Sequence, residues 1–415
     1  MVTVNRARSR AAALLASLAA VSCGGSDSST APSPSASPPT PVSNVVAVVV
    51  DQGPASATNP TVNTLYTSVT VCVPGSTTEC QTIDHIQVDT GSYGLRILAP
   101  VLMINLPLTN APDANALVEC TKFVDGYSWG PVATADMQVS GEKVASLPLQ
   151  LIGAANFTNV PADCSSSGPA EQTVATFGAN GILGIGPFQY DCFECNTNSS
   201  NLVYYSCSAT ACTPTVAPLA NEVQNPVPLF ATDNNGTIIV LPAVSPPGAA
   251  TLSGSLLFGI DTESNNASGT ETVLTLDGMG EFTTTLNGAS LKQSFIDSGT
   301  NGLFFDDSAI PTCSSQNFTD FYCPASAENL SATLSAAGTS AASATIAFSI
   351  GNAQTLVTND PTFAALPTLS GTYSTSQGLA GATFDWGLPF FYNRRVATAI
   401  EGGTTAVGTG PYVAF

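Results

Sequence analysis

The sequence predicts an all-β protein built from two related lobes. Glycine and proline are frequent, with 35 and 29 residues in a chain of 415, and short runs rich in Val, Thr, Ile and Phe lie between them. This texture is typical of strands separated by turns, whereas long apolar stripes with a helical period are scarce. One short phrase also occurs twice, as "VDTGSYGLRI" at 88–97 and "IDSGTNGLFF" at 296–305. A repeat separated by about half the chain length indicates two lobes of related structure.

The composition limits the kinds of function that the protein can have. Hydrophobic residues make up 44% of the chain and charged residues only 9%, with a formal net charge of -20. The chain can therefore bury a large core. A strongly acidic surface repels phosphate, so no nucleic acid partner is expected. The low content of basic residues is compatible with tolerance of acid, although solubility alone also explains it.

Residues 1–22 have the features of a secretory signal peptide. Arginines at positions 6, 8 and 10 precede the apolar run "AAALLASLAAV" and small residues, and the run is too short for an ordinary membrane span. Cys23 makes the segment resemble a bacterial lipoprotein signal, with Ala20 where the usual pattern prefers Leu. The resemblance implies a lipid-modified Cys23 and a lipid anchor in the bacterial outer membrane of the cell envelope. An ordinary cleaved signal is the alternative.

The remaining chain divides into a tether and two lobes. Residues 23–44 are too rich in Ser, Pro and Gly to pack a core and are expected to form a tether. The N-terminal lobe is expected at 45–262, with a Cys-rich insertion near 188–228, and the C-terminal lobe at 263–415. We expect a monomer that touches the membrane only through its anchor.

The cysteines agree with export. Ten remain besides Cys23, an even number that suggests disulfides in an oxidising compartment. Cys72 and Cys80 are near enough to close a local loop, as are Cys313 and Cys323. The insertion contains four more cysteines, at 192, 195, 207 and 212. Zinc is an alternative there, but the spacing of the second pair favours two disulfides, and neither a metal nor a cofactor is expected.

The repeated phrase has a chemical logic. In each copy apolar residues end a strand, and Gly allows a sharp turn that presents the preceding Asp on a rigid loop. One such tripeptide is an ordinary turn, but two in the same context suggest that Asp89 and Asp297 meet between the lobes. Two adjacent carboxyl groups cannot both ionise cheaply, so they share a proton and titrate as a unit.

These motifs resemble the pepsin-like aspartic peptidases. "ANGILGIGPF" at 179–188, "GSLLFGIDTES" at 254–264 and "FDWGLPFFYNRRVATAI" at 384–400 are similar to later segments of that family in the same order. With the tether, the chain more narrowly resembles a bacterial family of pepsin-like lipoproteins. The resemblance implies a bilobal pepsin-like double β-barrel with an interlobe cleft and a few short helices.

The resemblance also implies a set of site residues. Asp89 and Asp297 match the catalytic pair, which activates a water that attacks the peptide bond of a polypeptide substrate. The residues that support the pair are two hydroxyls that brace the loops across the lobes, two that bond the outer carboxylate oxygens, and two central glycines: Thr90 and Ser298, Ser92 and Thr300, Gly91 and Gly299.

Three positions depart from the family pattern. The flap that closes over substrate matches residues 122–141, where Phe123, Tyr127 and Trp129 compete for the place of its usual Tyr. Arg96 stands where many members have Trp, and an Arg directed at the pair would oppose proton sharing. In "DWG" at 385–387, Asp and Trp stand in place of the two aliphatic residues that usually precede the Gly.

Rival functions are weaker. A Ser-His-Asp triad would have to use His85, the only histidine, and no Gly-x-Ser-x-Gly elbow accompanies it. "DNNGT" at 233–237 lacks the ligand spacing of a calcium loop. The expected function is an aspartic-type endopeptidase. The alternatives are a non-catalytic pepsin-like lipoprotein that binds peptide or another ligand, and an unrelated β-rich surface protein such as an adhesin.

Overall fold

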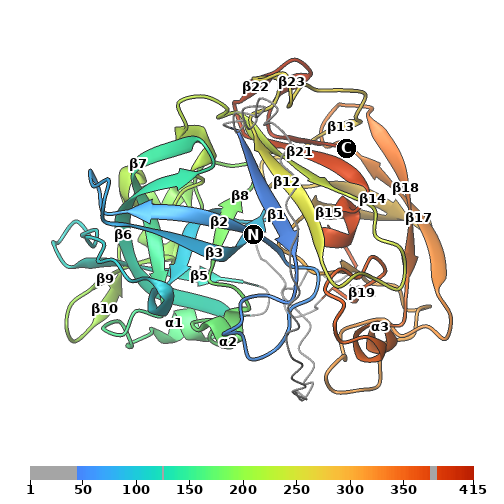
Figure 1. Ribbon diagram of the computed structural model, residues 1–415, viewed down its shortest axis with the longest axis horizontal. Helices are drawn as coiled ribbons and strands as arrows, with labels where there is room; N and C mark the ends of the chain where they lie inside the picture. Colours follow the sequence, from blue (N-terminus) through green and yellow to red (C-terminus); the bar gives the residue numbers. More distant parts are fainter. Residues whose placement is uncertain (1–43, 124–125, 374–380) are drawn as a thin grey trace, which may run out of the picture.

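The computed structural model describes residues 44–123, 126–373 and 381–415. Within these ranges the fold is mostly β, with 24 strands and three short α-helices. Figure 1 shows one lobe in blue to green on the left and another in orange to red on the right. The predicted all-β, two-lobed architecture is therefore confirmed. The predicted signal peptide at 1–22, Cys23 and all of the tether except Asn44 lie outside the described residues.

The first half of the chain forms twelve strands. They are β1 (Val45–Val50), β2 (Leu65–Cys72), β3 (Cys80–Asp89), β4 (Tyr93–Leu98), β5 (Ala116–Lys122), β6 (Tyr127–Val139), β7 (Glu142–Ile152), β8 (Gly181–Ile185), β9 (Tyr204–Cys207), β10 (Cys212–Pro214), β11 (Gly236–Leu241) and β12 (Leu252–Phe258). Two single-turn helices, α1 (Ala162–Ser165) and α2 (Val174–Phe177), lie between β7 and β8.

The second half forms the other twelve. They are β13 (Val273–Thr275), β14 (Phe282–Leu286), β15 (Ala289–Ile296), β16 (Leu303–Phe305), β17 (Glu328–Ser335), β18 (Ser343–Ile350), β19 (Ser370–Gly371), β20 (Phe384–Trp386), β21 (Arg394–Ala399), β22 (Thr404–Thr405), β23 (Gly408–Thr409) and β24 (Tyr412–Ala414). Helix α3 (Ala353–Asn359) precedes β19, and Asn352 caps it through its side-chain oxygen.

The N-terminal lobe contains a closed barrel. Its strand order is β6-β7-β4-β8-β3-β2, and β2 also pairs with β6, which closes the ring. Strand β4 is buried along its whole length because both of its faces are covered. Its apolar residues Leu95 and Ile97 enter the main core, so Arg96 between them points to the opposite face.

The C-terminal lobe is an open sheet. Its order is β18-β17-β14-β15-β20-β16-β19. The strands around the repeated phrase pair in the same way in both lobes. In the N-terminal lobe β8 is parallel to β3 and antiparallel to β4. In the C-terminal lobe β20 is parallel to β15 and antiparallel to β16. The repeated phrase therefore marks a repeated local topology.

A third layer joins the lobes. Strands β1, β12 and β11 continue into β21, β24 and β13, and β11 pairs with β21 from Gly236–Ala399 to Leu241–Arg394. In Figure 1 strands β1, β12 and β21 lie between the two lobes. The 15-stranded sheet that contains the N-terminal barrel therefore also includes β13, β21 and β24 from the second half of the chain, while the seven-stranded sheet of the C-terminal lobe is separate.

Five disulfides cross-link the described residues. Cys72–Cys80 and Cys313–Cys323 close the local loops that the spacing predicted. The insertion forms the expected two disulfides, Cys192–Cys195 and Cys207–Cys212, so these cysteines do not ligate zinc. Cys120–Cys164 joins β5 to α1. This density of disulfides is typical of an exported protein. Across the described ranges, no helix is both long and apolar enough to span a membrane.

Candidate active site

The two repeated phrases meet between the lobes. Asp89 is the last residue of β3, and Asp297 directly follows β15. Both carboxyl groups are fully buried, and they hydrogen-bond each other. The central glycine of the first phrase is required by this approach, because a Cβ on Gly91 would lie 2.5 Å from the carboxyl carbon of Asp297. The sequence repeat thus brings together the two residues that it singled out.

The loops around the pair are built symmetrically. The amide of Gly91 donates to Asp89 Oδ1 at 2.7 Å, and the amide of Gly299 donates to Asp297 Oδ1 at 2.7 Å. Each carboxyl group is therefore fixed by the backbone of its own turn. Hydrogen bonds from backbone amides also favour the ionised form of a carboxyl group.

Two hydroxyl residues connect the loops across the lobes. The amide of Ser298 donates to Thr90 Oγ1 at 2.9 Å, and the amide of Thr90 donates to Ser298 Oγ at 3.1 Å. The Ser298 hydroxyl donates onward to the carbonyl of Val88 at 2.8 Å. Thr90 and Ser298 lie as the family resemblance implied, and their reciprocal bonds hold the two aspartates at a fixed separation.

The outer hydroxyls differ between the lobes. Thr300 Oγ1 lies 3.0 Å from Asp297 Oδ2. Ser92, three residues after the other aspartate, is buried, but its hydroxyl has no hydrogen-bond partner in this structure. The bond expected from Ser92 to Asp89 is therefore absent, while the bond expected from Thr300 is present.

A third carboxyl group lies beside the pair. Asp385 in β20 is fully buried, and its Oδ2 lies 2.9 Å from the same Thr300 Oγ1. Burial raises the pKa of Asp297 well above its usual range, and the negative charges of Asp89 and Asp385 raise it further. Burial likewise raises the pKa of Asp385. The sequence marked Asp385 only as a departure, although an acid between Phe384 and Trp386 in a strand-like run is itself a signal of a buried charge.

Two more residues reach the pair that the sequence did not single out. Tyr93 is buried in β4, and its pKa is raised by burial first and then by the charges of Asp89, Glu401 and Asp297. Its ring packs edge-on against Phe188. Gln87 in β3 donates from Nε2 to the carbonyl of Gly299 at 2.9 Å, a further link across the lobes.

Arg96 does not point into the pair. Its guanidinium contacts Glu119 Oε1 at 2.5 Å and Asp191 Oδ2 at 3.0 Å, and it donates to the carbonyl of Tyr93 at 2.6 Å. Although burial lowers the pKa of Arg96, these two acids raise it above its ordinary value. The expected conflict with proton sharing therefore does not arise, because strand alternation directs Arg96 toward β5 rather than toward Asp89.

The flap segment forms the β5–β6 hairpin. Phe123 packs edge-on against Phe177, and Trp129 packs edge-on against Tyr205. All three candidates, Phe123, Tyr127 and Trp129, are buried in hydrophobic clusters of the N-terminal lobe. Residues 124 and 125 at the turn lie outside the described residues, so the structure assigns the flap role to none of the three.

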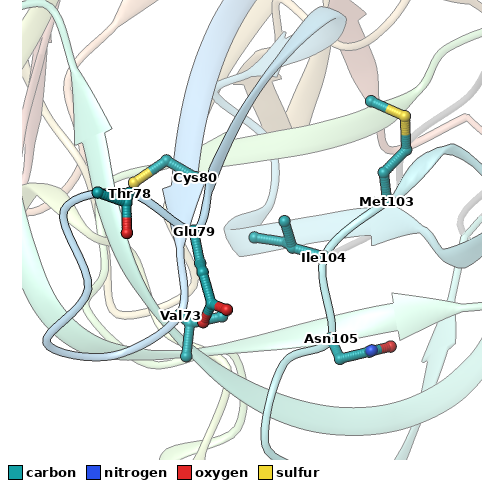
Figure 2. Close-up of a pocket in the computed structure, with 7 residues that line it drawn as sticks. All are labelled: Val73, Thr78, Glu79, Cys80, Met103, Ile104 and Asn105. Carbon is teal, nitrogen blue, oxygen red and sulfur yellow. The ribbon is translucent and has the colours of Figure 1, made fainter.

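Other features lie apart from the pair. His85 in β3 contacts Asp51 and Asp84, each at 3.3 Å. Figure 2 shows a pocket of about 270 Å³ between the Val73–Cys80 turn and the Met103–Asn105 segment, with Glu79 and Met103 on facing sides. None of its lining residues belongs to the repeated phrases. In the described part of the chain no group of His, Cys, Asp and Glu is arranged to hold a metal ion.

Comparison with known proteins supports the fold. The structure is similar to the crystal structure of an aspartic proteinase from Irpex lacteus, with a TM-score of 0.51 and 14% sequence identity over 89% of this chain and 96% of that one. The fold is therefore a bilobal pepsin-like fold. No curated protein matches the sequence. The family model described as "Protein of unknown function (DUF3443)" matches residues 40–415.

Proposed function

We propose that this chain, which belongs to the DUF3443 family of unknown function, is an aspartic-type endopeptidase. The observation that carries the proposal is the buried, hydrogen-bonded pair of Asp89 and Asp297, held by reciprocal bonds between Thr90 and Ser298. A proton shared by two rigidly held carboxyl groups is the device needed for concerted acid and base catalysis.

The pair supplies both proton transfers of amide hydrolysis. Burial and the neighbouring acids raise the pKa of Asp297, which favours keeping the shared proton on the pair. Asp89 then takes a proton from a water held between the two groups, and Asp297 donates its proton to the carbonyl oxygen of the scissile amide. The water oxygen bonds to the carbonyl carbon, so no covalent bond to the protein forms. The C–N bond then breaks as Asp89 gives its proton to the amine nitrogen, and a hydroxyl proton of the intermediate returns to the pair.

A second candidate function is binding of peptide or another ligand without cleavage. Its supporting observation is that both carboxyl groups are 0% exposed, so a substrate reaches them only if the covering segments move. A polypeptide is the expected substrate of the peptidase. We also propose a lipid anchor at Cys23, supported by the sequence pattern and by the export that five disulfides indicate.

The discriminating experiment measures cleavage of denatured casein between pH 3 and pH 7. Asp89→Asn and Asp297→Asn should each lower kcat/KM by about 10²- to 10⁴-fold, the usual contribution of a general acid or base. Asp84→Asn is the matched control, since Asp84 lies on β3 but its side chain is 71% exposed. Folded wild-type protein that binds a statine-type inhibitor without cleaving casein would favour the binding function. Cleavage that survives both active-site substitutions would contradict the peptidase assignment.

A further inference from the structure

The Thr300 hydroxyl lies within hydrogen-bonding distance of two carboxyl oxygens but has only one proton to donate. Its oxygen lies 3.0 Å from Asp297 Oδ2 and 2.9 Å from Asp385 Oδ2. A threonine hydroxyl carries one hydrogen and donates once, and an ionised carboxylate can only accept. Both contacts are hydrogen bonds only if one of the two aspartates is protonated and donates to Thr300. The geometry therefore places a proton on Asp297 or Asp385, with Thr300 donating to the other.

The same proton count applies to all three carboxyl groups. The hydrogen bond between Asp89 and Asp297 also requires a proton on one of its two partners. A series of hydrogen bonds runs from Asp89 through Asp297 and Thr300 to Asp385. Every bond in this series has a donor proton when the three carboxyl groups together hold two protons. Its net charge is then a single negative charge, the same as that of an isolated pair that shares one proton.

The surroundings of Asp385 favour its neutral form. Asp385 pairs with Phe295 and Phe304 on the two flanking strands, and its Oδ1 is buried without a hydrogen-bond partner. The charged groups that act on this cluster are Asp89 and Asp297 themselves. Among the described residues no Lys, Arg or His forms an ion pair with Asp297 or Asp385. An isolated charge in such a place is costly, and protonation removes the cost.

We propose that Asp385 stores the second proton of the site and exchanges it with Asp297 through the Thr300 hydroxyl. In the transfer the acid proton of Asp385 moves to Thr300 Oγ1 while the hydroxyl proton of Thr300 moves to Asp297 Oδ2. Asp385 becomes a carboxylate, Asp297 becomes an acid, and Thr300 is unchanged. This role rests on the proposed peptidase function, because it restores the proton that Asp297 gives to substrate without access to bulk water. Asp385 is thus a positioning residue that acts through Asp297.

The first test does not depend on catalysis. The infrared signal of protonated carboxylic acids is recorded for the folded protein near pH 6, as a difference between wild type and each variant. Asp385→Asn, which keeps the side-chain shape, should remove one protonated carboxyl group, and Asp385→Leu should remove the same signal. Asp84→Asn, at a position whose side chain is 71% exposed, should remove none. An unchanged signal in the folded Asp385 variants would overturn the proposal, because Asp385 would then be ionised.

The second test follows the pH profile of casein cleavage. Asp385 becomes negatively charged once it has lost its stored proton at higher pH, and that charge makes the pair hold its remaining proton longer. Asp385→Asn should therefore move the alkaline limb of kcat/KM down by about one pH unit. Thr300→Val keeps Asp385 but breaks the relay, so it should lower kcat more than it raises KM, and Thr300→Ser should restore kcat. An alkaline limb that Asp385→Asn leaves in place would overturn the catalytic role. An inactive wild type that shows the infrared signature would contradict the peptidase function while supporting the stored proton.

Discussion

The two halves of the site have the same local arrangement of strands but compensate buried charge in different ways. The seventh residue after each aspartate is Arg96 in β4 and Phe304 in β16, and these residues pair with Ile182 and Asp385 respectively. The N-terminal half thus carries a buried cation, Arg96, on β4. The C-terminal half carries a buried acid, Asp385, on β20.

The difference shows two solutions to one physical problem. Arg96 is fully buried and is compensated by Glu119 and Asp191 at hydrogen-bonding distance. Asp385 has no such cation and is compensated by a proton and by Thr300. An ion pair holds its charges at any pH where both groups are ionised, whereas a protonated acid responds to pH. The N-terminal phrase therefore carries a compensated cation at Arg96, whereas beside the C-terminal phrase Asp385 is the group whose charge changes with pH.

Removing the cation should have the largest effect. Arg96→Met leaves Glu119 and Asp191 buried without their partner, and we expect a loss of about 3 to 5 kcal/mol in the free energy of unfolding at pH 7. Urea denaturation measures it. Arg395→Met is the matched control, since the Arg395–Glu271 pair is partly exposed and should contribute less than about 1 kcal/mol. Equal losses in the two variants would mean that Arg96 is not the support of its half.

Glu222 provides an intermediate test, because it is an acid of the N-terminal half that is not paired with Arg96. Burial first, and then the charge of Glu119, raise the pKa of Glu222 from its ordinary value of 4.5 to about 8. A raised pKa means that its contribution to stability is fully present below pH 4.5 and is lost as pH rises toward 8.

Replacing Glu222 with Gln should remove this dependence. The free energy of unfolding of wild type should fall relative to Glu222→Gln by up to about 1.4 kcal/mol per pH unit inside the window from 4.5 to 8. Thermal unfolding followed across that range measures the slope. Parallel curves for the two proteins would show that Glu222 ionises normally in the fold.

The smallest expected effect concerns the two outer hydroxyls. The Ser92 hydroxyl makes no hydrogen bond, so Ser92→Ala should change the free energy of unfolding by less than about 1 kcal/mol. Thr300→Val deprives two buried carboxyl oxygens of their partner and should cost about 1 to 3 kcal/mol. Urea denaturation of both variants at pH 5 decides the matter, and a larger loss at Ser92 would contradict the asymmetry.

The sequence predicted the parts of this site that repeat. Asp89 and Asp297 were readable because a strand, a glycine turn and a second strand recur with the same spacing, while the cross-bracing role of Thr90 and Ser298 followed from the family resemblance. Local chemistry of that kind depends on neighbours in the chain. The fold class and the two local disulfides followed from short-range patterns in the same way.

The parts that were not readable depend on contacts between distant segments. The partners of Arg96 are 23 and 95 residues away, so the sequence could raise its charge as a concern but could not show where the guanidinium points. Asp385 meets Thr300 across 85 residues of chain. Phe123, Tyr127 and Trp129 could not be ranked, because packing against Phe177 and Tyr205 is a tertiary property.

The sheet that joins the lobes has a consequence for how the protein melts. Strands β11 and β21 form an unbroken ladder from Gly236–Ala399 to Leu241–Arg394, and Asn63 adds bonds from the N-terminal half to Asn301 and Leu366. Because this ladder pairs a strand from the first half of the chain with one from the second half, neither of these strands can unfold without breaking backbone hydrogen bonds of the other. Cooperativity should therefore extend over the whole folded region, which is expected to show one calorimetric transition with equal van't Hoff and measured enthalpies.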